Sequence, residues 1–117
     1  MKLLLHGVHV TLSPALKETV YEQLVAPVEK VADDEAAELE VHLCDTNGPK
    51  GGLDKECRVT LRLPNLPALH VTERSEDLFK CIQLTSDRLE RMAKRLLERH
   101  RTEGRRGGSR EMGAGEA

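Results

Sequence analysis

A row of arginines near the C-terminal end is the part of this sequence best suited to chemistry. The row has the spacing i, i+3, i+7 and i+11, which places guanidinium groups along one stripe of a helix. Guanidinium groups match phosphate in charge and in donor geometry, and such contacts bind nucleic acid without reading its sequence. The segment 88–106 contains eight Lys or Arg and three Glu, a net charge of +5. The candidate phosphate-binding residues are Arg88, Arg91, Lys94, Arg95 and Arg99.

The same charges fit a simpler interpretation, a solvated helix with ion pairs between residues four apart, such as Glu90 and Lys94. Charged helices are common, so the charge pattern alone favours this interpretation. The whole chain has a net charge of −2, but the segment 13–40 has eight acidic residues against two lysines, a net charge of −6. A rival hypothesis for the function is therefore a protein-interaction module that engages a basic partner through an acidic first helix.

A glycine-rich loop at residues 47–52 invites comparison with phosphate-binding loops. A nucleotide-binding P-loop needs the pattern GxxxxGK followed by Ser or Thr at the start of a helix. Here Gly51 and Gly52 lead into a strand pattern, so we interpret the segment as a hairpin loop. We expect Lys50 and Lys55, in and beside this loop, to reach RNA as additional contacts.

Strand alternation places three histidines and one cysteine on the polar face of the expected sheet, namely His6, His42, Cys44 and His70. Zinc accepts mixed nitrogen and sulfur ligands. No CxxC or HxxxH spacing is present, however, and an exposed polar face is the simpler interpretation. We therefore make no prediction of a metal site, and we expect no cofactor. The sequence also lacks a supported Ser-His-Asp or Cys-His motif, so we predict neither an enzyme nor a small-molecule substrate.

The composition indicates a small cytoplasmic protein. Its 117 residues are 38% hydrophobic and 32% charged, which suits one domain with a core of about 100 residues. The three cysteines are odd in number, which indicates reduced thiols. The apolar run at residues 3–5 is too short for a signal peptide, and no segment approaches the roughly 18 apolar residues of a membrane span. The chain has only two aromatic residues, and this scarcity argues against recognition of single-stranded RNA by base stacking.

Period-two alternation predicts four strands. The first covers residues 2–12, with a bulge near Gly7 because the apolar phase changes there. The second lies around residues 39–44, the third around 57–63, and a short fourth strand includes residues 69–71.

Helical periodicity predicts two helices. The first begins at Ser13 as the cap and Pro14 as the first residue, and Pro27 either kinks it or ends it. The second is capped by Ser75 and runs to about Arg101. The buried face of the first helix consists of Leu16, Val20, Leu24, Val28 and Val31. That of the second consists of Leu78, Ile82, Thr85, Leu89, Met92, Ala93 and Leu96.

These elements predict an α+β fold, a β-α-β-β-β-α two-layer sandwich. A right-handed crossover makes the first two strands parallel, so the four-stranded sheet is mixed. Both helices lie on one face of the sheet, because only one face is apolar. We expect a domain at residues 1–101 and a disordered C-terminal tail at residues 102–117, where glycines are frequent and large apolar residues scarce.

Four short motifs in this order are more specific than any of them alone. They are Leu3-x-Leu5-x-Gly7-x-x-Val10-x-Leu12, Ser13-x-Ala15-Leu16-Lys17-Glu18-x-Val20, Asp77-Leu78-Phe79-x-x-Ile82 and Asp87-Arg88-Leu89-Glu90-Arg91. Over residues 2–101 the chain resembles the ribosome hibernation-promoting factor family. Its members are also called ribosome-associated inhibitor A or sigma-54 modulation proteins.

The resemblance implies a translation inhibitor that silences ribosomes under stress. Family members dock in the decoding region of the small ribosomal subunit, mostly through basic residues of the last helix. Arg88 and Arg91 fall at positions where the family has basic residues, and Lys94, Arg95 and Arg99 continue that surface. With this resemblance, contact with rRNA becomes the preferred interpretation of the arginine row, and the small subunit becomes the expected partner.

The sequence departs from the family pattern in three places. Its first helix is acidic, its loop at residues 47–52 is longer and richer in glycine than in short members, and we expect no second domain after it. We therefore expect that the chain does not pair ribosomes through the dimerising extension of long members.

Overall fold

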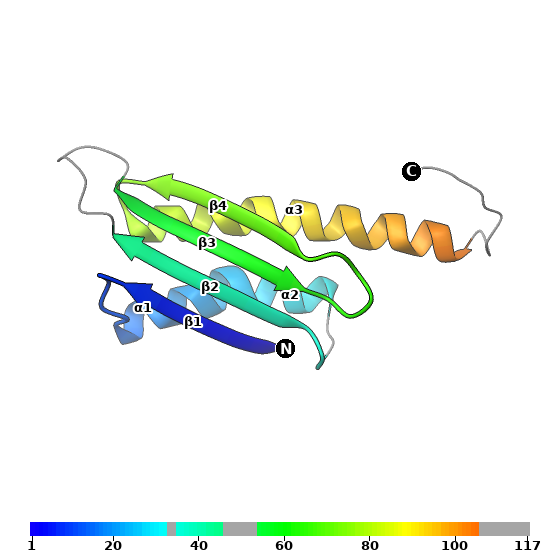
Figure 1. Cartoon of the computed structure of the whole chain (residues 1–117), viewed down its shortest axis with the longest axis horizontal. Coiled ribbons are helices and arrows are strands. Elements are labelled where there is room, and N and C mark those ends of the chain that lie inside the picture. Colours follow the sequence, from blue (N-terminus) through cyan, green and yellow to red (C-terminus); the bar gives the residue numbers. More distant parts are fainter. Residues whose placement is uncertain (33–34, 46–53, 106–117) are drawn as a thin grey trace.

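The computed structural model describes residues 1–32, 35–45 and 54–105, with side chains as far as residue 100 (Figure 1). The first part of the chain comprises β1 (Lys2–Val8), α1 (Pro14–Val20), a π-helical turn η1 (Tyr21–Val25) and α2 (Ala26–Val31). The second part comprises β2 (Glu38–Asp45), β3 (Lys55–Arg62), β4 (Leu69–Ser75) and α3 (Leu78–Arg105). Because α1, η1 and α2 form one helical segment, the predicted order β-α-β-β-β-α is confirmed.

The four strands form one mixed sheet in the order β1-β2-β3-β4. β1 and β2 are parallel, as expected when a helical segment crosses over between them. β2, β3 and β4 are antiparallel neighbours. Figure 1 shows all helices on the far side of the sheet, so its other face is open. The predicted fold class, an α+β sandwich with its helices on one face, is confirmed.

The core lies between the sheet and the helices, and the predicted apolar stripes contribute most of it, except that Leu97 rather than Leu96 packs against it. Burying each large aliphatic side chain stabilises the fold by roughly 1.5–3 kcal/mol relative to exposure. The largest fully buried side chains are Val20, Leu24, Val25, Val28, Leu39, Val41, Leu43, Val59, Leu61, Val71, Ile82 and Leu89. The residues that alternate with them on the strands point to the open face, which is polar as predicted.

The first helical segment begins as predicted and continues through Pro27 without ending. The hydroxyl of Ser13 accepts a hydrogen bond from the N–H of Leu16 at 3.2 Å. Pro27 has no N–H to donate to the Gln23 carbonyl four residues earlier, and η1 is wound as a π-helix immediately before it. The hydroxyl of Ser86 in α3 donates to that carbonyl. A donor from the neighbouring helix thus replaces the one that proline lacks, and it ties the two helices together.

β1 is shorter than predicted, and the expected strand over residues 2–12 with its bulge near Gly7 is wrong. Gly7 pairs with Leu43 in regular register. The change of phase occurs at His9, which has a left-handed backbone with φ of 58°. A Cβ atom at position 7 would lie 2.9 Å from the carbonyl oxygen of Val10. Glycine is therefore required where the chain folds back against the end of β1.

α3 begins later than predicted. Ser75 is the last residue of β4 rather than the helix cap, and its hydroxyl accepts a hydrogen bond from the N–H of Asp77 at 3.3 Å. Asp77 takes the capping position, because its Oδ1 accepts from the N–H of Phe79 at 3.0 Å. β4 is consequently longer than the short strand expected around residues 69–71.

α3 also ends later than predicted, at Arg105 rather than near Arg101. Its 28 residues span about 42 Å at 1.5 Å per residue, whereas β4 has only seven residues. The helix therefore projects beyond the sheet (Figure 1). Residues 106–117 of the predicted tail lie outside the described residues. Among the described helices, none combines the length and the hydrophobicity that a membrane span requires.

The three cysteines are free thiols in two different environments. Cys44 is half-buried on β2. Burial raises the pKa of Cys57 to about 12 and that of Cys81 to about 11. Both buried cysteines are therefore neutral thiols at physiological pH.

Candidate nucleic-acid interface

The five basic residues that the sequence singled out on α3 are all exposed, but they differ in whether their charge is paired. Arg88 Nη1 lies 2.9 Å from Oε2 of Glu73 on β4. Lys94 Nζ lies 3.2 Å from Oε2 of Glu90, which is the helical ion pair that the simpler interpretation anticipated. The other three residues are Arg91, Arg95 and Arg99. They form no ion pair with any residue that the structure describes.

The arginine row lies on the flank of α3 that faces β4. Arg88 fixes this direction, because its partner Glu73 belongs to β4. Residues three, seven and eleven positions later return to nearly the same side of a helix. Arg91, Arg95 and Arg99 therefore continue the row toward the end of α3 that projects beyond the sheet. We call these three residues the free arginine strip.

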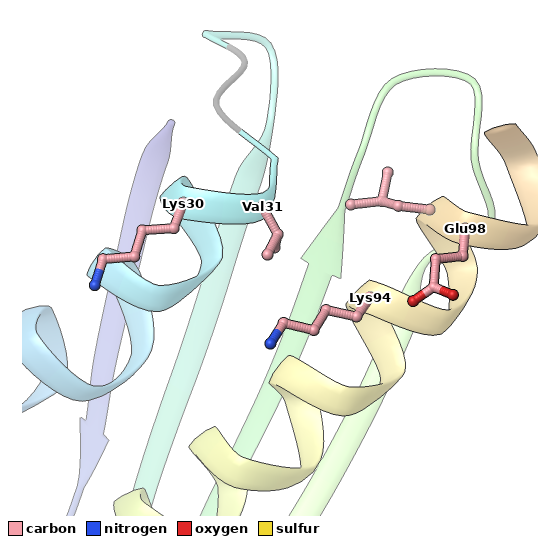
Figure 2. A pocket seen from close by; sticks show the side chains of 5 residues that line it. Lys30, Val31, Lys94 and Glu98 are labelled. Atoms are coloured by element: carbon pink, nitrogen blue, oxygen red, sulfur yellow. The ribbon is translucent and has the colours of Figure 1, made fainter.

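A groove on the other flank of α3 faces α2 (Figure 2). Its lining residues are Lys30 and Val31 from α2, and Lys94, Leu97 and Glu98 from α3. Lys30 and Lys94 thus line one groove from two helices, and Figure 2 shows the ammonium group of Lys30 pointing away from α3. Sequence reasoning missed Lys30 because it belongs to the acidic segment 13–40, and only the packing of α2 beside α3 brings it close to the basic helix.

Of the two lysines expected to reach RNA from the loop, the structure describes only Lys55. Lys50 lies outside the described residues. Lys55 is the first residue of β3, and its Nζ lies 3.2 Å from Asp45 and 3.0 Å from Asp54. Hydrogen bonds to Asp54 and Asp45 raise the pKa of Lys55 above its ordinary value. Because two carboxylates compensate this ammonium group and its side chain is only 23% exposed, we leave Lys55 out of the proposed interface.

The acidic residues of segment 13–40 do not form a single surface. Glu38 and Glu40 lie on β2 and point to the open face of the sheet, away from the helices. The acidic residues of the first helical segment are Glu18, Glu22 and Glu29, with Lys17 next to the first and Lys30 next to the last. The described acidic charge is divided between two faces, so the structure gives little support to a docking surface made of an acidic first helix.

The open face of the sheet also contains Arg58, Arg62 and Arg74, and each of them has a carboxylate partner. The pairs are Arg62–Glu38, Arg62–Glu40, Arg58–Glu56 and Arg74–Glu56, with nitrogen–oxygen distances of 3.1 to 3.5 Å. Hydrogen bonds from His42 and Arg62 hold the pKa of Glu40 below its ordinary value. The charges on this face therefore largely compensate one another, which distinguishes it from the flank of α3.

These features define a class of small α+β domains with a half-covered sheet and a long basic last helix. Residues 3–101 match the family described as Sigma 54 modulation protein / S30EA ribosomal protein. The chain belongs to this family of ribosome-associated proteins, and the resemblance expected from the sequence motifs is confirmed. No curated protein matches the sequence significantly.

The solved structures that share this fold include the following two. The N-terminal domain of Protein Y from Thermus thermophilus superposes with a TM-score of 0.68 at 24% identity, over 81% of this chain and 98% of that one. A ribosomal subunit interface protein from Coxiella burnetii gives a TM-score of 0.66 at 21% identity, over 84% of this chain and 99% of that one. At these identities the likeness concerns the fold.

Proposed function

We propose that this protein binds the small ribosomal subunit through the free arginine strip of α3 and inhibits translation as a hibernation factor. The observation that carries the proposal is the strip itself, three exposed guanidinium groups with no ion-pair partner among the described residues. Membership of a ribosome-associated family supports a ribosomal ligand.

The chemistry of the strip suits rRNA phosphates. A guanidinium group without a protein partner can bind phosphate with two donors and need not first break an ion pair. Each contact releases counterions from the RNA, so affinity falls as salt rises. Such contacts position the protein on folded RNA without reading bases, which agrees with the scarcity of aromatic side chains.

The proposed site on the ribosome is the decoding region, between the head and the body of the small subunit. A domain bound there excludes messenger and transfer RNA by occupying their space. Inhibition of this kind is stoichiometric and requires no catalytic group, so the proposal describes a cytoplasmic binding protein rather than an enzyme.

Co-sedimentation with purified ribosomal subunits tests the proposal. The protein should pellet with small subunits at about 50 mM salt and be released as salt rises. Large subunits alone should not retain it, and messenger RNA with transfer RNA bound beforehand should reduce its binding. If the protein stays in the supernatant at about 50 mM salt, or pellets equally with both subunits, the proposed function is wrong.

A further inference from the structure

Three side chains on the open face of the sheet have the composition and the spacing of a metal site. His6 of β1 and His42 of β2 are direct partners in the parallel ladder, and their rings stack with centroids 4.6 Å apart. Glu40 lies two residues before His42 and therefore shares its face. Its Oε2 lies 2.9 Å from Nε2 of His42 and 3.8 Å from Nε2 of His6.

We propose that His6, Glu40 and His42 bind a divalent transition-metal ion of the zinc type. One potential ligand atom from each residue lies within 4.8 Å of the other two. Two imidazole nitrogens and one carboxylate oxygen are a ligand set that Zn²⁺ accepts at about 2.0–2.2 Å. Mg²⁺ and Ca²⁺ prefer oxygen ligands alone, so this set disfavours them.

The surroundings allow the ion to enter and orient one of its ligands. The side chains of His6 and His42 are 50% and 39% exposed, so their rings can turn toward a common point. Arg62 donates to Oε1 of Glu40 at 3.1 Å, which leaves Oε2 directed at the histidines. Three protein ligands leave a fourth tetrahedral position to water or to a group from a binding partner.

Arginines nearby limit the affinity. Arg58 is the ladder partner of His42 on β3, and Arg62 contacts Glu40 directly. Arg58 already forms an ion pair with Glu56, and Arg62 shares its charge with a second carboxylate, Glu38. We therefore expect weaker binding than at a closed structural zinc site with four protein ligands.

The site spans the edge of the sheet. Among the described strands, β2 is the only neighbour of β1 in the sheet, and the ligands come from both strands. An ion held by both strands binds the folded state alone and stabilises it by mass action. At a zinc concentration about 100 times the Kd, we expect the thermal midpoint to rise by roughly 10 °C.

The ligand set differs from the one considered from the sequence, in which Cys44 and His70 accompanied the two histidines. Neither belongs to the group that the structure gathers. The Nδ1 of His70 instead lies 3.1 Å from the hydroxyl of Thr60, within hydrogen-bonding distance. Both residues lie on the same open face, so their variants are matched controls for the proposed site.

Calorimetric titration of the full-length, reduced protein with Zn²⁺ tests the site. We expect one ion per chain, with affinity at least about tenfold lower in His6→Gln and in His42→Gln, since each loses one ligand bond. Glu40→Gln should also bind more weakly, whereas His70→Gln and Cys44→Ser should bind like the parent protein. Circular dichroism and the metal-free thermal midpoint establish that each variant is folded.

Imidazole NMR signals give a second readout on the unmodified chain. Substoichiometric Zn²⁺ should perturb the signals of His6 and His42 and leave that of His70 in place. The proposal is overturned if no zinc binds, if His6→Gln and His42→Gln retain parent affinity, or if Cys44→Ser abolishes binding. Because the site lies on the face opposite the helices, none of these results depends on ribosome binding.

Discussion

The open face of the sheet and the flank of α3 both present arginines, yet the fold equips them differently. On the open face, Arg58, Arg62 and Arg74 each lie beside a glutamate from their own or a neighbouring strand. On α3, the free arginine strip has no such partner among the described residues. The comparison shows that net charge does not reveal which arginines are unpaired, because the fold decides which of them lie beside a carboxylate.

Removing the free arginine strip should have the largest effect. Replacing Arg91, Arg95 and Arg99 together with Gln should lower affinity for small subunits at least about 100-fold, because each charge-assisted contact contributes roughly 1.5 kcal/mol or more. Sedimentation or fluorescence anisotropy measures the loss. The substituted side chains are solvated, so the thermal midpoint should stay within a few degrees of the parent value.

The matched control replaces Glu18, Glu22 and Glu29 with Gln on the first helical segment. This variant should bind small subunits as well as the parent protein or slightly better, because it removes negative charge from the helix side. Loss of binding in this control, with retention in the arginine variant, would identify the first helix as the interaction surface. A basic protein partner would then replace rRNA.

A smaller effect is expected at Arg88, the arginine of the row that already forms an ion pair with a carboxylate. Glu73→Gln removes the partner of Arg88, so that a fourth guanidinium group joins the strip. Affinity for small subunits should rise about two- to fivefold, since one exposed pair is worth at most about 1 kcal/mol. Unchanged affinity would mean that the RNA-binding surface begins after Arg88.

The rate at which each cysteine is alkylated should distinguish the open face from the interior, and this measurement does not involve ribosome binding. Cys44 is partly exposed, whereas burial raises the pKa values of Cys57 and Cys81 and keeps their thiolates scarce at pH 8. Iodoacetamide should therefore modify Cys44 in the native protein and the other two only after denaturation, as read by mass spectrometry. Rapid native modification of Cys57 would show that the two layers open readily.

The sequence predicted most of the fold because its apolar periodicities are regular. Leu16, Val20, Leu24 and Val28 recur once per helical turn, and all four are buried. The errors fall at element ends, where local hydrogen bonds decide between close alternatives. Asp77 rather than Ser75 caps α3, since β4 extends further than its two apolar residues suggested.

The candidate site was predictable only in part. Helical spacing revealed the arginine row, because the residues of one helix have fixed relative positions. Helical spacing does not predict ion pairs between different elements. The ion pairs Arg88–Glu73 and Lys55–Asp45 were therefore found only in the structure. The same holds for Lys30, which the packing of α2 brings to the groove beside Lys94.

The most direct test compares two variants that each remove three positive charges. One variant has Gln at each position of the free arginine strip. The other has Gln in place of Arg58, Arg62 and Arg74 on the open face. Affinity for small subunits is measured over a range of salt concentrations after the thermal midpoints have shown that both variants fold. The strip variant should flatten the slope of log affinity against log salt by about two units, since each phosphate contact contributes about 0.7–0.9. The open-face variant should keep nearly the parent slope. Equal flattening in both variants would contradict the assignment of RNA binding to α3.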